Sequence, residues 1–168
     1  MELKKYFGFF ILILLPNLLR QIIYKTTNYF TGSVGFIISF ETAKLYSTNL
    51  WFLAFLEEAV IGLVFAFLWF KVKPLRFLSY GWISDAFLDY CVTLFWLIVG
   101  KTPFQLLNLN PLIDFILREI FFPYLVLGML LYHLKVSIRK LVLAYLIFGV
   151  LILSLIIKFG GANLINVI

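Results

Sequence analysis

Residues 50–70 read LWFLAFLEEAVIGLVFAFLWF, an apolar stretch that is interrupted only by the pair Glu57-Glu58. A helix needs roughly 20 apolar residues to cross a bilayer, and this stretch supplies that length. The whole chain of 168 residues is 64% hydrophobic and only 13% charged, with a mean hydropathy of +1.06. A soluble domain needs far more polar surface to stay dissolved. We therefore expect an all-α integral membrane protein.

Four other apolar stretches have the length of a membrane span, so we expect a bundle of about five transmembrane helices in a single domain, 1–168. These stretches are residues 6–24, 77–99, 112–134 and 141–157. Residues 29–40, reading YFTGSVGFIISF, are too short to span and contain two glycines. We expect this segment to be re-entrant or interfacial, and a sixth short span is the alternative.

Basic residues gather at alternate ends of the predicted spans, and this pattern predicts an orientation. The basic clusters are Lys4 and Lys5; Lys71, Lys73 and Arg76; and Lys135, Arg139 and Lys140. Cytoplasmic loops carry the excess of lysine and arginine, so we expect a cytoplasmic N-terminus and an external C-terminus. The formal charge of +6 is then membrane anchoring, and no nucleic-acid partner is expected.

Local signals support the span boundaries. Asn110-Pro111 places an N-cap residue and an N1 proline at the start of the fourth span. Tryptophans favour the membrane interface, and we expect most of them near span ends. The four are Trp51, Trp69, Trp82 and Trp96.

Seven ionisable residues nevertheless lie inside the predicted spans. They are Arg20, Glu57, Glu58, Asp85, Asp89, Arg118 and Glu119. Each costs about 2.5–3.5 kcal/mol near a helix centre, so they are expected to face one another, water or a ligand. Five carboxylates stand against two arginines. The surplus must be protonated or balanced by a cation, because uncompensated buried charge is too costly.

The second span specifies the direction of one of these acids. Ala54, Glu58, Gly62 and Ala66 recur every four residues and form one stripe of small side chains around the glutamate. Small residues allow helices to approach closely in membranes, so we expect Glu58 to face a neighbouring helix, of this chain or of a partner. Glu57 lies about 100° further round the helix.

The third span carries two acids on one face. Trp82, Asp85, Asp89, Thr93 and Trp96 share this face at three- and four-residue spacing. Two carboxylates one turn apart disfavour joint ionisation, so at least one is expected to be protonated or bound to a cation. Asp89 lies deeper and is the stronger functional residue. The alternative is a polar seam packed on a partner helix, with Asp85 hydrated near the cytoplasmic end.

The fourth span begins with Asp114, Arg118 and Glu119. The i,i+4 spacing predicts a local salt bridge between Asp114 and Arg118. The alternative makes Arg118 the counter-ion of Glu57 or Glu58 across helices.

Several kinds of site are excluded or not indicated. The single histidine, His133, excludes a site with two histidine ligands, and the single cysteine, Cys91, excludes an intrachain disulfide. No phosphate-binding loop, nucleophile elbow or metalloprotease motif occurs in the chain. We therefore predict no catalytic residue, resident metal or cofactor.

The leading hypothesis is a transport-related membrane protein, a solute- or ion-binding subunit with a polar site in the outer half of the bundle. The site would take a cationic or zwitterionic solute or a cation, and its residues are Arg20, Glu57, Glu58, Asp89, Arg118 and Glu119. One alternative is an accessory, immunity or assembly protein that packs on a partner's helices through the stripe of Ala54, Glu58, Gly62 and Ala66. Another is an intramembrane enzyme acting on a lipid-linked substrate.

Overall fold

The computed structural model describes residues 2–27, 47–101 and 103–160, and the part of the chain that it describes is helical without a strand. The elements are α1 (Glu2–Thr27), α3 (Ser47–Lys71), η2 (Lys73–Leu75), α4 (Arg76–Val99), α5 (Pro103–Leu106), α6 (Pro111–Phe115), η3 (Ile116–Gly128), α7 (Met129–His133), α8 (Ile138–Leu155) and η4 (Ile156–Gly160). The all-α prediction is confirmed. The expected re-entrant segment 29–40 lies outside the described residues.

Within the described ranges, four helical stretches are long and apolar enough to cross a membrane. They are Leu3–Ile23, Lys73–Val99, Leu112–His133 and Ile138–Lys158. Helix α3 forms where the second span is expected, and its 25 residues are also sufficient to cross a bilayer at about 1.5 Å per residue. The helices therefore correspond in position to the five predicted spans.

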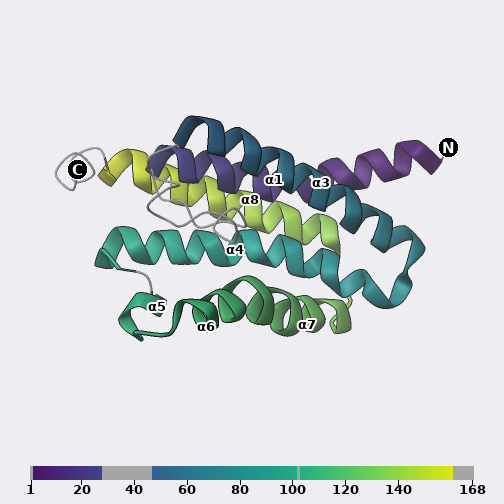
Figure 1. Cartoon of the computed structure of the whole chain (residues 1–168). Coiled ribbons are helices and arrows are strands. Elements are labelled where there is room, and N and C mark those ends of the chain that lie inside the picture. The colour runs from purple at the N-terminus through teal and green to yellow at the C-terminus, as the bar shows by residue number, and fades with distance from the viewer. Residues whose placement is uncertain (1, 28–46, 102, 161–168) are drawn as a thin grey trace.

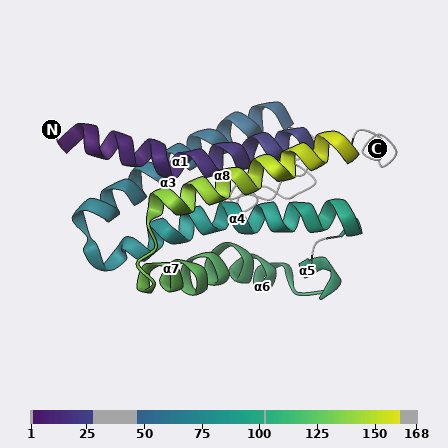
Figure 2. The same cartoon turned by 180° about the vertical axis from the view of Figure 1, so that it is seen from behind.

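Helix α4 occupies the middle of the bundle. Figure 1 shows α4 between a group formed by α1, α3 and α8 and the rod formed by α6, η3 and α7, and α4 contacts α1, α3, α8, η3 and α7. The same arrangement is seen from behind in Figure 2. Helix α1 begins at one end of the bundle, and α8 ends at the opposite end. A side chain on α4 can therefore meet residues from nearly every other part of the bundle.

Glycine allows the rod to approach α4 closely. A Cβ atom on Gly128 would lie 2.7 Å from the Phe77 carbonyl oxygen and 3.0 Å from the Gly81 Cα. Real side chains do not reach these separations, so the backbones of α4 and η3 meet at a distance that only glycine permits. This contact fixes the depth at which the polar residues of η3 face α4.

The N-terminal end of the rod is capped as predicted. The Asn110 side chain accepts a hydrogen bond from the Leu112 N–H at 2.9 Å, and Pro111 is the first helical residue. An N-cap side chain satisfies a backbone donor that has no partner inside the helix. From Ile116 the rod continues with π-helical hydrogen bonds, and it contains Pro123, which has no N–H to donate.

Two apolar cores lie along the bundle. The larger contains Phe9, Ile13, Tyr80 and Trp82, and the smaller contains Ile23, Tyr90, Ile152 and Ile156. In α1, Arg20 lies between Ile13 of the first core and Ile23 of the second. The buried polar residues are therefore placed between two apolar layers.

Candidate functional site

The site is built around Arg20 of α1, whose side chain is 1% exposed. Its Nη1 atom lies 2.6 Å from Asp85 Oδ2 and 2.9 Å from Asp89 Oδ2. Its Nη2 atom forms an ion pair with Glu58 Oε1. One guanidinium thus contacts three carboxylates from two other helices, and we name these four residues the Arg20 cluster.

Helical periodicity brings the acids to one place. Asp85 and Asp89 are one turn apart on α4 and therefore point to the same side. Glu58 reaches them from α3 because the stripe on that helix packs inward: Gly62 lies against Trp82, and Ala66 is buried. The prediction that Glu58 faces a neighbouring helix is confirmed. Three members of the stripe contact the chain itself, and the Ala54 side chain lies outside the description.

Trp82 completes the contacts of Glu58. Its indole Nε1–H donates a hydrogen bond to Glu58 Oε2 at 3.0 Å, and only 2% of its surface is exposed. Trp82 therefore faces the bundle interior. The signal was present in the sequence, since Trp82 shares a face with Asp85 and Asp89.

The placement of Asp85 is the main correction to the sequence analysis. The site predicted from the sequence does not include Asp85, and one interpretation hydrates it near the cytoplasmic end, whereas the structure buries it against Arg20. The reason is the length of the arginine side chain, which extends from α1 to two successive turns of α4. Its i,i+4 relation to Asp89 was the available signal.

The ionic groups of the rod form a second, simpler arrangement. Arg118 Nη2 lies 3.1 Å from Glu119 Oε1, with side-chain exposures of 17% and 9%. The charge of Arg118 also acts on the Asp114 carboxylate, in the direction that the predicted i,i+4 pairing requires, although Asp114 Oδ1 makes no hydrogen bond in the described part of the chain. Between these two residues, at Ile116, the winding of the rod becomes π-helical.

Arg118 and Glu119 also act on the Arg20 cluster at longer range. Arg118 interacts electrostatically with Asp85, and Glu119 interacts with both Asp85 and Asp89. The alternative interpretation makes Arg118 the counter-ion of Glu57 or Glu58, and in the structure Glu58 forms an ion pair with Arg20. Glu57, on the adjacent face of α3, is half-buried.

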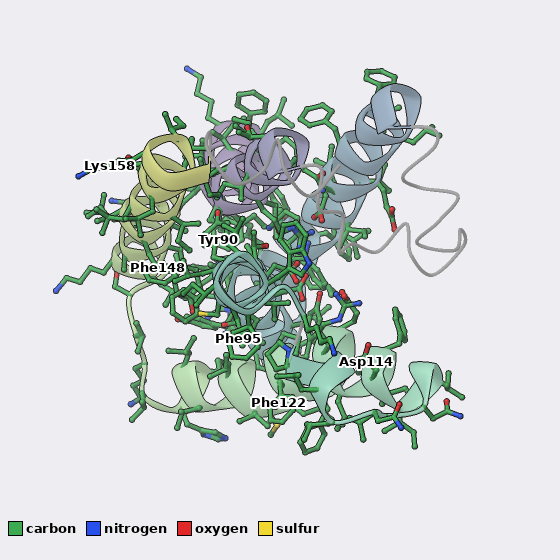
Figure 3. The ribbon with its side chains drawn as sticks, turned by 90° about the vertical axis from the view of Figure 1, so that its left-hand side faces the viewer. Tyr90, Phe95, Asp114, Phe122, Phe148 and Lys158 are labelled. Carbon is green, nitrogen blue, oxygen red and sulfur yellow. The ribbon has the colours of Figure 1, made fainter. Side chains whose placement is uncertain are left out.

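Figure 3 views the bundle along its length and shows nitrogen and oxygen atoms gathered between α1, α3 and α4. Tyr90 lies on the side of α4 toward α1, and Asp114 lies on the rod. The Tyr90 hydroxyl donates a hydrogen bond to the Pro16 carbonyl oxygen at 2.5 Å, which ties α4 to α1 one turn before Arg20. The helices that supply the cluster are therefore also joined beside it.

The charges of the Arg20 cluster do not balance. With every group ionised, three carboxylates against one guanidinium leave two negative charges inside the membrane. Such a surplus needs protons or a bound cation, because uncompensated buried charge is too costly. Among the described residues, no three His, Cys, Asp or Glu side chains are grouped so that they could hold a metal ion.

Sequence and structure comparisons offer no relative from which a function could be carried over. No protein-family model, no curated protein and no solved structure matches this chain. The chain is a multi-pass membrane protein by its four apolar helices, and the Arg20 cluster is its candidate site.

Proposed function

We propose that this protein is a transport component that binds a cationic species at the Arg20 cluster. The observation that carries the proposal is the sharing of one buried arginine by Glu58, Asp85 and Asp89. Ionisable groups inside a membrane protein that face the bundle interior are typical of ion and proton pathways. Two of its acids lie on α4, the helix that contacts nearly all the others, so a change in their charge acts on the whole bundle.

The surplus of carboxylates over arginine in the Arg20 cluster favours a ligand-binding role over a purely structural packing role. Packing needs only a neutral pair, because each additional buried carboxylate adds a desolvation cost. Arg20 contacts three carboxylates, two more than a neutral pair contains, and they lie between two apolar cores. A site that takes up and releases protons or cations uses such a surplus, since its negative charge is the attraction for the ligand.

The remaining predicted site residues fit the same proposal. Glu119 and Arg118 form a balanced pair whose charges act on Asp85 and Asp89 without adding to the surplus. With the basic loops in the cytoplasm, Arg20 and Glu58 fall in the outer half of the membrane. A cationic or zwitterionic solute, an inorganic cation or a proton would then enter from the outside.

Trp82 provides a reporter inside the site. Its indole N–H donates to the Glu58 carboxylate, so its emission responds when the charge of that carboxylate changes. The substitutions Trp51→Phe, Trp69→Phe and Trp96→Phe leave Trp82 as the single emitting tryptophan. We expect its emission in detergent or vesicles to change saturably with pH or with added cations.

The controls separate the site from the rest of the chain. Glu58→Gln in the single-tryptophan protein keeps the side-chain shape and should abolish the response. Asp114→Asn removes a carboxylate of the rod outside the Arg20 cluster and should preserve it. Emission that stays constant with pH and with every cation tested, in a folded protein, would overturn the proposal in favour of a packing role.

A further inference from the structure

Two turns at one end of the bundle carry six basic residues. Residues 71–76 read KVKPLR and run from the end of α3 into α4, and residues 135–140 read KVSIRK and run from the end of α7 into α8. Figures 1 and 2 show both turns at the end of the bundle where α1 begins. Neither turn contains an acid, and in the described part of the chain none of the six forms an ion pair with a carboxylate. We name them the basic end: Lys71, Lys73, Arg76, Lys135, Arg139 and Lys140.

A single tyrosine joins the two turns. The Tyr80 hydroxyl, on the second turn of α4, donates a hydrogen bond to the Val136 carbonyl oxygen at 2.6 Å. The Tyr80 ring also lies 5.4 Å from the Trp69 ring of α3 and 6.4 Å from the Tyr132 ring of α7, centroid to centroid. Because these contacts connect all three helices, the basic side chains of both turns belong to one surface.

Arg76 is fixed at this surface through one part of its guanidinium. Its Nε–H donates a hydrogen bond to the Trp69 carbonyl oxygen at 2.8 Å, and its Cζ atom lies 5.2 Å from the centre of the Trp69 ring. With the described residues, its Nη1 and Nη2 atoms make no hydrogen bond. Two such nitrogens match the oxygens of a phosphate group. The side chain can therefore bind an anion without giving up its own contacts.

Lys135 occupies a backbone position that usually favours glycine. Its φ is 51°, in the left-handed region, and its N–H donates a hydrogen bond to the Tyr132 carbonyl oxygen at 3.1 Å at the end of α7. Glycine is common at such helix ends because it lacks the Cβ atom that makes this conformation costly. A lysine here adds strain to the fold and positive charge to the surface. Its presence favours a role for the charge.

Exposed apolar side chains lie one helical turn from basic residues of both turns. Phe67 precedes Lys71 by four residues and is 52% exposed, and Leu143 follows Arg139 by four residues and is 58% exposed. A soluble anion requires only the positive charge, whereas a lipid requires positive charge beside an apolar surface. The basic end offers both.

We propose that the basic end binds the headgroup of an anionic phospholipid. Its phosphate lies against Arg76 and the lysines of the two turns, and its acyl chains lie along the apolar flanks of α3 and α8. Clusters of lysine and arginine at a membrane surface attract anionic headgroups in this way. The proposal does not depend on the Arg20 cluster, which lies deeper in the bundle between the two apolar cores.

Native mass spectrometry in a neutral detergent tests the proposal, because it counts bound lipids and measures their affinity. Dioleoylphosphatidylglycerol and dioleoylphosphatidylcholine have the same acyl chains and differ in the net charge of the headgroup. We expect the phosphatidylglycerol to bind saturably and at least tenfold more tightly than the phosphatidylcholine. Equal affinity for the two lipids would overturn the proposal.

Lys135→Gly is the most informative variant, since it removes one charge and also the left-handed strain. The phosphatidylglycerol affinity should fall about fivefold, without a loss of thermal stability. Adding Arg139→Gln and Lys140→Gln should lower the affinity about a hundredfold in total. Lys101→Gln is the matched control, because it removes an exposed lysine beyond the opposite end of α4 and should leave the affinity unchanged.

Equal effects of Lys135→Gly and Lys101→Gln would also overturn the headgroup site. Glu58→Gln separates this proposal from the proposed function, because it changes the Arg20 cluster and leaves the basic end intact. We expect it to bind phosphatidylglycerol as the native chain does, even though its Trp82 response is lost. Loss of phosphatidylglycerol binding in a folded Glu58→Gln protein would contradict a site at the basic end.

Discussion

The Arg20 cluster and the Arg118–Glu119 pair place arginine inside the same membrane protein in opposite ways. Arg20 is 1% exposed and meets three carboxylates from two other helices, whereas Arg118 is 17% exposed and pairs with its own neighbour in the chain. The pair is balanced and local, so it explains how a charge is tolerated in the membrane. The cluster is unbalanced and joins three helices, so its surplus charge has to be neutralised by something outside those four residues.

Replacing each arginine by methionine tests this difference most strongly. Arg20→Met leaves three buried carboxylates without their cation, and breaking such a buried arrangement costs about 3–5 kcal/mol. Arg118→Met removes one partner of a partly exposed pair and should cost roughly 1 kcal/mol. Unfolding in mixed detergent micelles, followed by circular dichroism, measures both. Equal losses would mean that the two sites do not differ as described.

A second experiment moves the rod, which holds Arg118 and Glu119, away from the Arg20 cluster. Gly128→Val places a side chain against the Phe77 carbonyl oxygen and should push η3 away from α4, at a cost of about 1–3 kcal/mol. The pH response of Trp82 should persist, because Arg20, Glu58 and Trp82 do not depend on that contact. Gly8→Val is the matched control, since a Cβ there meets nothing within 4 Å. Loss of the Trp82 response in Gly128→Val alone would show that the cluster needs the rod.

A smaller effect distinguishes the carboxylates of the two regions. Asp85→Asn removes one surplus charge but keeps a hydrogen-bonding oxygen for Arg20, so stability should change by less than about 1 kcal/mol. Glu119→Gln weakens the one ion pair shown for Arg118 and should cost about 1 kcal/mol. The same unfolding measurement applies to both variants. A larger loss for Asp85→Asn than for Glu119→Gln would contradict the assignment of surplus charge to the Arg20 cluster.

The sequence predicts the helices and part of the site for reasons that are local. Hydropathy marks the spans, and the spacing of Glu58, Gly62 and Ala66 gives the direction of the glutamate. Asn110-Pro111 marks a helix start that the structure confirms.

The partners of the charges depend on packing, which the sequence does not reveal. Asp85 is judged by its distance from the end of a span, but the reach of Arg20 decides its environment. The ion pair between Arg118 and Glu119 joins neighbouring residues of η3 and does not follow from an i,i+4 spacing.

The central claim is that the Arg20 cluster holds more negative charge than its arginine neutralises. Infrared spectroscopy of protonated carboxyl groups, at neutral pH in choline chloride, measures this directly, because protons alone can then neutralise the surplus. We predict a protonated-carboxyl band in the native protein that weakens when a cation binds at the site and that is weaker in the Glu58→Gln, Asp89→Asn double variant. A native protein without this band in choline chloride would contradict the account.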